Sequence, residues 1–215
     1  MSTLIVPDWP VVGNVVAATT TRATPEQALP PGIAFLHQVH GATVVPIDAV
    51  RASDEALEAD AVTGRRAGDI CAVRTADCLP VLFCARDGSE VAAAHAGWRG
   101  LAAGVLENTV KALETRPDRL LAWIGPSISQ PSFEVGDDVR DAFVSRDPDA
   151  SSAFSANARG RWQADLVGLA RQRLARAGVE DVYGGRWCTY RDAERFHSYR
   201  RDPACGRLVS FILLR

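Results

Sequence analysis

The spacing of apolar residues along the chain predicts many strands and fewer helices. Short apolar runs bounded by Gly, Pro or Asp are typical of strands, above all where Val, Ile and Thr are frequent. We expect strands over residues 3–6, 14–21, 33–40, 43–47, 69–75, 79–85, 90–95, 120–125 and 207–214. The dipeptide Asp87-Gly88 favours a hairpin turn between the runs 79–85 and 90–95.

Apolar residues recur at helical spacing in two longer segments, 98–114 and 164–177. The second segment has Asp165 near its start and Gly178 just after its end, and both residue types favour helix boundaries at those positions. A shorter helix is predicted to begin near Asp137. Strands outnumber helices, and hairpins alternate with crossovers. We therefore predict an α+β fold, a single domain over residues 1–215 with mixed β-sheets flanked by helices.

Composition narrows the class of protein. Of the 215 residues, 47% are hydrophobic and 23% are charged, as in ordinary globular proteins, and the formal net charge is −2. We therefore expect no nucleic acid and no membrane as partner. The first residues resemble no signal peptide, and the five cysteines show no paired spacing, so a reduced, cytoplasmic setting is expected. Arginines and acidic residues interleave over residues 186–207, which is typical of a mixed-charge surface.

Three short motifs carry candidate metal ligands. His40 lies in QVHG, Cys78 in TADC and His95 in AHAGWRG, each within a run of small and apolar residues. Two imidazoles and one thiolate suit zinc with a fourth position left open, which is typical of a catalytic rather than a structural zinc. The three residues are far apart in the sequence, so their spacing alone also fits buried histidines and a packed cysteine.

The remaining ligand candidates are weaker. His37 and His40 are three residues apart and point to opposite faces of a strand, so only one of them can face the site, and we choose His40. His197 lies among long charged neighbours. The other cysteines are predicted to be inert packing residues; they are Cys71, Cys84, Cys188 and Cys205.

Charged residues near these motifs suggest further roles. Asp60 and Asp77 are flanked by apolar residues, and each either caps a strand end or orients a ligating imidazole or transfers a proton. Arginine side chains could bind an anion or form ordinary surface ion pairs; the candidates are Arg22, Arg74 and Arg99.

The order and the residues of eight motifs resemble those of a known family. The motifs TTR, HQVHGATV, EADAVTG, ICAVRTADCLPVLF, AAHAGWRG, WIGPSIS, FEVGDDV and FHSYRRDPACGR, in this order from Thr20 onward, are similar to those of the YfiH/laccase-domain family. Its members, once called multicopper or polyphenol oxidases, are described as zinc-dependent purine nucleoside phosphorylases with adenosine deaminase activity. The resemblance implies that His40, Cys78 and His95 are the zinc ligands. The chain departs from the family after TTR, where ATPEQALPPGIA replaces a longer Gly-, Asn- and Arg-containing segment.

The sequence is compatible with several functions. The resemblance implies phosphorolysis of adenosine, inosine or 5′-methylthioadenosine, or deamination of adenosine, with purine nucleoside and phosphate as small-molecule partners. His40, Cys78, His95 and Asp77 would then be catalytic, and Arg22, Asp60 and Arg99 would bind substrate. The alternatives are a copper-dependent phenol oxidase, a metal-free Cys–His amidase acting on peptidoglycan precursors, and a non-catalytic binding domain. Copper is the less expected metal, because the only methionine, Met1, would have to supply a blue-copper axial ligand. The oligomeric state is left open.

Overall fold

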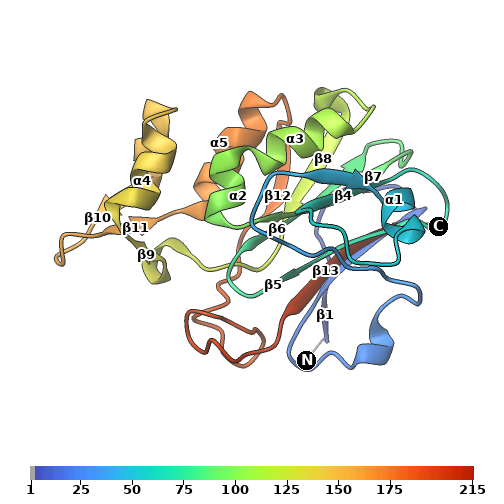
Figure 1. Ribbon diagram of the computed structural model, residues 1–215, viewed down its shortest axis with the longest axis horizontal. Coiled ribbons are helices and arrows are strands. Elements are labelled where there is room, and N and C mark those ends of the chain that lie inside the picture. The colour runs from blue at the N-terminus through green and yellow to red at the C-terminus, as the bar shows by residue number, and fades with distance from the viewer. Residues whose placement is uncertain (1–2) are drawn as a thin grey trace.

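The computed structural model describes residues 3–215, which form two packed β-sheets with helices on one side (Figure 1). A six-stranded mixed sheet has the order β12-β8-β6-β7-β4-β3, and a four-stranded antiparallel sheet has the order β1-β2-β13-β5. The strands of the first sheet are β3 (Val44–Pro46), β4 (Ala61–Gly64), β6 (Leu79–Ala85), β7 (Val91–Ala96), β8 (Leu120–Ile124) and β12 (Asp181–Gly184). Those of the second are β1 (Leu4–Ile5), β2 (Val15–Thr20), β5 (Ile70–Thr75) and β13 (Leu208–Leu214).

Helices cover the outer face of the six-stranded sheet. Figure 1 shows α2 (Trp98–Ala103), α3 (Val105–Ala112) and α5 (Leu166–Arg176) lying along it. A short helix, α1 (Ile47–Ala52), follows β3. The helix α4 (Asp137–Val144) stands apart beside a small antiparallel sheet, β10-β11-β9; its strands are β9 (Glu134–Val135), β10 (Phe154–Ala156) and β11 (Trp162–Ala164). The predicted α+β class with mixed sheets is confirmed.

The residues of β6 explain why the six-stranded sheet is buried on both faces. Leu79, Val81 and Phe83 pack into the core formed with the helices, while Leu82 and Cys84 pack into the core between the two sheets. Side chains alternate between the faces of a strand, so a continuous apolar run serves both cores. Because β6 and β7 form an antiparallel hairpin, the carboxyl end of β7 lies beside the start of β6.

Two predicted elements differ from the structure. Residues 33–40 form no strand, apart from one bridge between His37 and Glu58, and at the end of this run the Asp60 side chain accepts the backbone N–H groups of Val39 and His40. The helix predicted over 98–114 is interrupted at Gly104, which has φ 97° in the left-handed region. The predicted boundaries around 164–177 hold: the Asp165 side chain accepts the Gly168 N–H at 2.9 Å.

No helix within residues 3–215 combines the length and the apolar character needed to cross a bilayer.

Candidate metal centre and adjoining cavity

The three predicted ligands meet at one end of the β6–β7 hairpin. His95 is the fifth residue of β7 and pairs with Pro80, so it lies beside Cys78, which immediately precedes β6. His40 approaches from the loop before β3. The candidate ligand atoms of these three residues all lie within 4.8 Å of one another, and Cys78 Sγ is 3.9 Å from His40 Nε2. Among residues 3–215, this is the one such group of His, Cys, Asp or Glu that could hold a metal ion.

Asp60 holds two of the three ligand residues, His40 and His95, through hydrogen bonds. Its carboxylate is fully buried and lies 2.8 Å from His95 Nδ1, which leaves Nε2 of that ring available to a metal. The same carboxylate accepts the backbone N–H groups of His40 at 3.0 Å and of Gly41 at 2.6 Å, and Val39 donates at 3.3 Å. These bonds hold His40 at φ 60°, a conformation that non-glycine residues rarely adopt.

Glycine is required where the start of α2 meets the ligands. A Cβ on Gly97 would lie 2.8 Å from His40 Cδ2 and 2.9 Å from Cys78 Sγ, so any side chain there would displace both ligands. A Cβ on Gly100 would lie 2.6 Å from the backbone oxygen of Gly41. The motif AHAGWRG therefore supplies one ligand and the space for the other two.

The charges of the cluster favour the metal-binding protonation state of the thiol. Burial alone would raise the pKa of Cys78, but hydrogen bonds and charge from His40 and His95 outweigh it and lower the pKa to about 7. Burial would lower the pKa of His95, whereas its contacts with Asp60 and Cys78 raise it to about 9. The pKa of Asp60 is lowered because its hydrogen bonds with His95 and Gly41 outweigh its burial.

This donor set fits a single zinc ion. Two imidazole nitrogens and a thiolate are ligands that zinc accepts, and three protein ligands leave one position open. The His–Cys–His group could therefore hold a metal ion, and the imidazole that Asp60 orients has the partner that ligating histidines usually possess.

A cavity of about 750 Å³ opens beside the cluster. His40, Cys78 and His95 form part of its lining. Its apolar wall consists of Trp98, Ile128, Phe133, Leu166 and Tyr199. Its polar side chains include Arg74, Arg200 and Arg207, together with His37, Gln38 and Asp77. The size lies within the range of about 300–1,000 Å³ that is common for small-molecule pockets.

Asp77 lines this cavity, but its carboxylate is occupied by the C-terminal loop, residues 185–207. Thr189 Oγ1 donates at 2.6 Å, Ser198 Oγ at 3.0 Å and the Arg200 N–H at 2.7 Å. The Asp77 backbone has φ 92°, and its carbonyl accepts the Ile128 N–H at 2.9 Å. The geometry thus makes Asp77 the anchor of the C-terminal loop.

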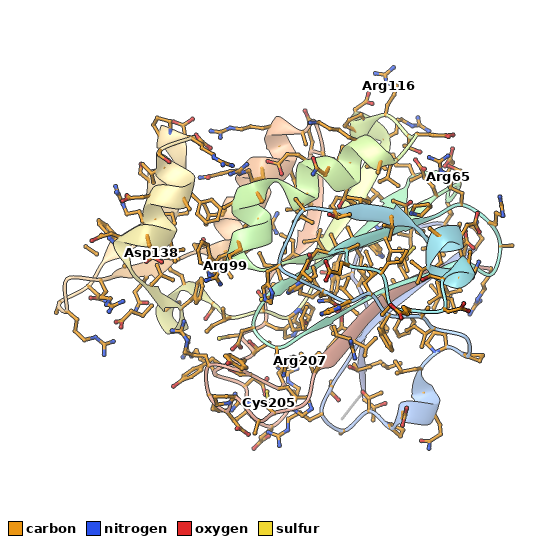
Figure 2. The ribbon with its side chains drawn as sticks, viewed as in Figure 1. Arg65, Arg99, Arg116, Asp138, Cys205 and Arg207 are labelled. Carbon is orange, nitrogen blue, oxygen red and sulfur yellow. The ribbon has the colours of Figure 1, made fainter. Side chains whose placement is uncertain are left out.

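The predicted substrate-binding residues, Arg22, Asp60 and Arg99, are not part of the cavity lining. Arg22 donates to the carbonyls of Ala193 and Arg195, and the guanidinium of Arg99 lies 4.4 Å from the Trp98 ring centroid (Figure 2). Asp60 is fully buried and hydrogen-bonded to His40 and His95. The roles of these three residues in substrate binding remain predictions.

The cavity also contains residues that the sequence reasoning did not assign to it. The interleaved charges of residues 186–207 predict a mixed-charge surface for Arg200 and Arg207, yet both side chains line the cavity. The motif FHSYRRDPACGR marks them as part of the family pattern, but its irregular backbone gives no spacing rule that would place them. His37 also lines the cavity, while His197 lies outside the ligand cluster.

The fold and the site together define an α+β protein that has, within residues 3–215, one candidate metal centre at the end of the β6–β7 hairpin. Residues 13–215 match the family described as multi-copper polyphenol oxidoreductase laccase, and the chain belongs to this family.

Relatives and solved structures agree with this family. A protein named purine nucleoside phosphorylase YfiH from Escherichia coli (strain K12) is 44% identical over 245 residues, covering 100% of both chains. A purine nucleoside phosphorylase from Pseudomonas aeruginosa has the same identity and coverage. Because the alignment is longer than the 215-residue chain, these relatives contain segments that this chain lacks.

Among solved structures, a Neisseria meningitidis protein described by the family label DUF152 superposes with a TM-score of 0.93 at 41% identity and covers 99% of both chains. YlmD from Geobacillus stearothermophilus gives a TM-score of 0.88 at 27% identity, covering 100% of this chain and 97% of its own. The resemblance to the YfiH/laccase-domain family is thereby confirmed.

Proposed function

We propose that this protein is a zinc-dependent purine nucleoside phosphorylase that cleaves adenosine, inosine and 5′-methylthioadenosine with phosphate, and that it also deaminates adenosine. The observation that carries the proposal is the shared cavity. The His–Cys–His cluster, an aromatic wall and three arginines line one space large enough for a nucleoside. The names of the 44% identical relatives support the same reaction class.

In the proposed reaction, different side chains of the cavity have different roles. His40, Cys78 and His95 would hold zinc, which when bound supplies a Lewis acid beside the substrate. Trp98, with the other aromatic side chains of the wall, offers flat apolar surfaces on which a purine can stack. The Asp60 carboxylate lies at hydrogen-bond distance from His95 Nδ1, which would leave Nε2 of that ring to hold the metal.

The proposal is tested with purified protein. Adenosine, inosine and 5′-methylthioadenosine are each incubated with and without phosphate and zinc, and the products are separated by chromatography. We expect free base and the sugar 1-phosphate only when phosphate is present, and inosine from adenosine without it. If the zinc-loaded protein leaves all three nucleosides unchanged under every condition, the proposed function is wrong.

One observation favours a second candidate, a Cys–His amidase. Cys78 Sγ lies near His40 Nε2, and the pKa of the thiol is lowered to about 7, as a nucleophile requires. A thiolate held by zinc is not available for attack. Turnover of an amide substrate that is faster in metal-free protein, with covalent trapping of Cys78, would favour this alternative.

Copper is the second metal to test, because the description of the family names it. Metal analysis of the purified protein, combined with a phenol-oxidation assay after zinc or copper loading, separates the two metals. The proposal expects zinc to support nucleoside turnover. Phenol oxidation that depends on copper would support the oxidase alternative.

A further inference from the structure

The cavity is lined by three arginines that form no ion pair. Within residues 3–215, no carboxylate lies within salt-bridge distance of Arg74, Arg200 or Arg207, whereas other arginines in the chain pair with acids, such as Arg173 with Glu107 at 2.8 Å. Three like charges that share one cavity repel one another unless an anion joins them. Their common location therefore indicates a site for an anionic ligand.

Arg74 lies on β5, and Arg207 is the last residue of the C-terminal loop, immediately before β13. Thr75 of β5 pairs with Leu208 of β13, and Arg74 pairs with Val209. Since side chains alternate along a strand, Arg207 lies on the same face as Arg74, at the diagonal position. Both guanidinium groups therefore reach the cavity from one sheet edge, at the end of β5 that leads to Asp77 and Cys78.

Contacts with aromatic rings orient the guanidinium groups. The Arg74 guanidinium carbon lies 4.9 Å from the centroid of the Phe35 ring, and that of Arg207 lies 5.8 Å from the Tyr199 ring. An arginine beside an aromatic face retains N–H donors along its edge. Some of these donors are used by backbone oxygens: Arg207 donates to the carbonyls of Cys205 and Gly206. The fork geometry suits oxyanions such as phosphate.

The third arginine comes from the loop that Asp77 anchors. The Arg200 backbone N–H binds Asp77, its Nη1 donates to the Glu134 carbonyl at 3.1 Å, and its guanidinium lies 5.3 Å from the Phe133 ring centroid. Asp77 is the one carboxylate in the cavity lining, and both of its oxygens accept hydrogen bonds from the loop. Asp77 forms no ion pair with the three arginines, so positive side chains outnumber this one carboxylate in the described lining.

We propose that Arg74, Arg200 and Arg207 form the subsite that binds inorganic phosphate, the second substrate of phosphorolysis. This inference rests on the proposed function. In the reaction, a phosphate oxygen forms a bond to C1′ of the ribose while the bond from C1′ to the purine nitrogen breaks. The bonding electron pair leaves with the purine, which takes up the proton that hydrogen phosphate loses on forming the sugar 1-phosphate. An anion held by these arginines shares the cavity with the metal ligands and the aromatic wall, so both substrates meet in one space.

The test uses zinc-loaded full-length protein with Arg74→Gln, Arg200→Gln and Arg207→Gln, and Arg116→Gln as the matched control. Arg116 forms an exposed ion pair with Asp118 and lies at the opposite side of the molecule from Arg207 (Figure 2). Because a hydrogen bond to a charged group contributes substantially to binding, each cavity variant should raise the KM for phosphate about tenfold or more. The KM for inosine, the phosphate-independent deamination of adenosine and the zinc content should stay within about twofold of wild type.

Lysine variants at the same positions separate charge from folding. Arg207→Lys and Arg74→Lys keep the charge but lose the fork, so they should recover part of the phosphate affinity. An unchanged phosphate KM in all three glutamine variants would overturn the proposal. Equal losses in deamination and phosphorolysis would also overturn it, because they would show a structural role.

A binding measurement keeps this inference distinct from the proposed function. Calorimetric titration of zinc-loaded wild-type protein with inorganic phosphate should show binding, and the Arg74→Gln and Arg207→Gln variants should lose it. This result would support the subsite even if no nucleoside is cleaved. Absence of phosphate binding to the wild-type protein, or binding retained in the variants, would overturn the subsite whatever the enzyme turns over.

Discussion

Two buried aspartates, Asp60 and Asp77, support different groups beside the cavity. Asp60 binds the ring of His95 and the backbone that carries His40, so it supports the metal ligands. Asp77 accepts hydrogen bonds from two side-chain hydroxyls and from the Arg200 N–H of the C-terminal loop, so it supports the loop that carries Arg200. The same residue type, also beside strand ends, takes its role from the donors that it accepts.

The proposed zinc and phosphate sites are therefore supported by different aspartates. Of the metal ligands, His95 lies on β7 and Cys78 immediately precedes β6, and these two strands pair from Leu79 and Ala96 to Cys84 and Val91. Two of the three cavity arginines, Arg200 and Arg207, lie in the irregular C-terminal loop. Hydrogen bonds to the buried Asp77 hold this loop against the segment between β5 and Cys78. Substitution of Asp60 should therefore weaken zinc binding, and substitution of Asp77 should weaken phosphate binding.

The largest effect is expected from removing a ligand. Cys78→Ala and His95→Ala should each abolish stoichiometric zinc binding and nucleoside turnover, because losing one of three protein ligands weakens the metal site and changes its chemistry. Zinc content by elemental analysis and inosine phosphorolysis measure both losses. Cys84→Ala, which removes a buried thiol from the core between the sheets, is the matched control and should retain zinc. Full zinc occupancy in Cys78→Ala would show that the ligand is wrong.

The next effect is expected at Asp60. Asp60→Asn should weaken zinc binding about 10- to 100-fold, because the partner of a ligating imidazole fixes its orientation and raises its basicity. The variant should also lose stability, since one amide NH₂ would face backbone donors that now bind a carboxylate. Competition titration with a zinc chelator measures the affinity. An unchanged zinc affinity in a folded Asp60→Asn variant would contradict the role given to Asp60.

A smaller and different effect is expected at Asp77. Asp77→Asn should leave zinc affinity within about twofold of wild type but raise the KM for phosphate several-fold, because the loop that carries Arg200 loses its charged anchor. Parallel zinc titrations and phosphate kinetics on the two Asn variants should show opposite patterns. If both variants lose zinc equally, the division between the two sides of the cavity is wrong.

The smallest perturbation uses pH and leaves the sequence unchanged. In metal-free protein, Cys78 should react with iodoacetamide at a rate that falls as pH drops below about 7, because its pKa is lowered to about 7 and only the thiolate reacts. Cys84, whose pKa burial raises to about 12, should stay unreacted in the folded protein. Mass spectrometry of peptides identifies the labelled thiol, and added zinc should protect Cys78. Equal labelling of both thiols would contradict this assignment.

The sequence predicts the part of this structure that depends on regular spacing. The β6–β7 hairpin follows from apolar runs around Asp87-Gly88, and residue chemistry alone brings His40, Cys78 and His95 together as candidates. The α5 helix follows from its apolar spacing and from Asp165 as its N-cap.

The remaining features depend on contacts between distant residues. The run 33–40 resembles a strand, but the backbone N–H groups at its end donate to the side chain of Asp60, about twenty residues later. Arg200 and Arg207 belong to a loop whose course is set by the buried Asp77, and mixed charges in an irregular segment indicate only a surface. Neither contact has a local signature in the sequence.

The most direct test of the metal centre is the location of zinc in crystals of the zinc-loaded protein by anomalous scattering at the zinc edge. The account predicts one strong peak per chain, about 2.0–2.1 Å from a nitrogen of His40 and of His95 and about 2.3 Å from Cys78 Sγ. A peak bound instead by His37 or His197, or zinc-dependent turnover with no metal at the three predicted ligands, would contradict it.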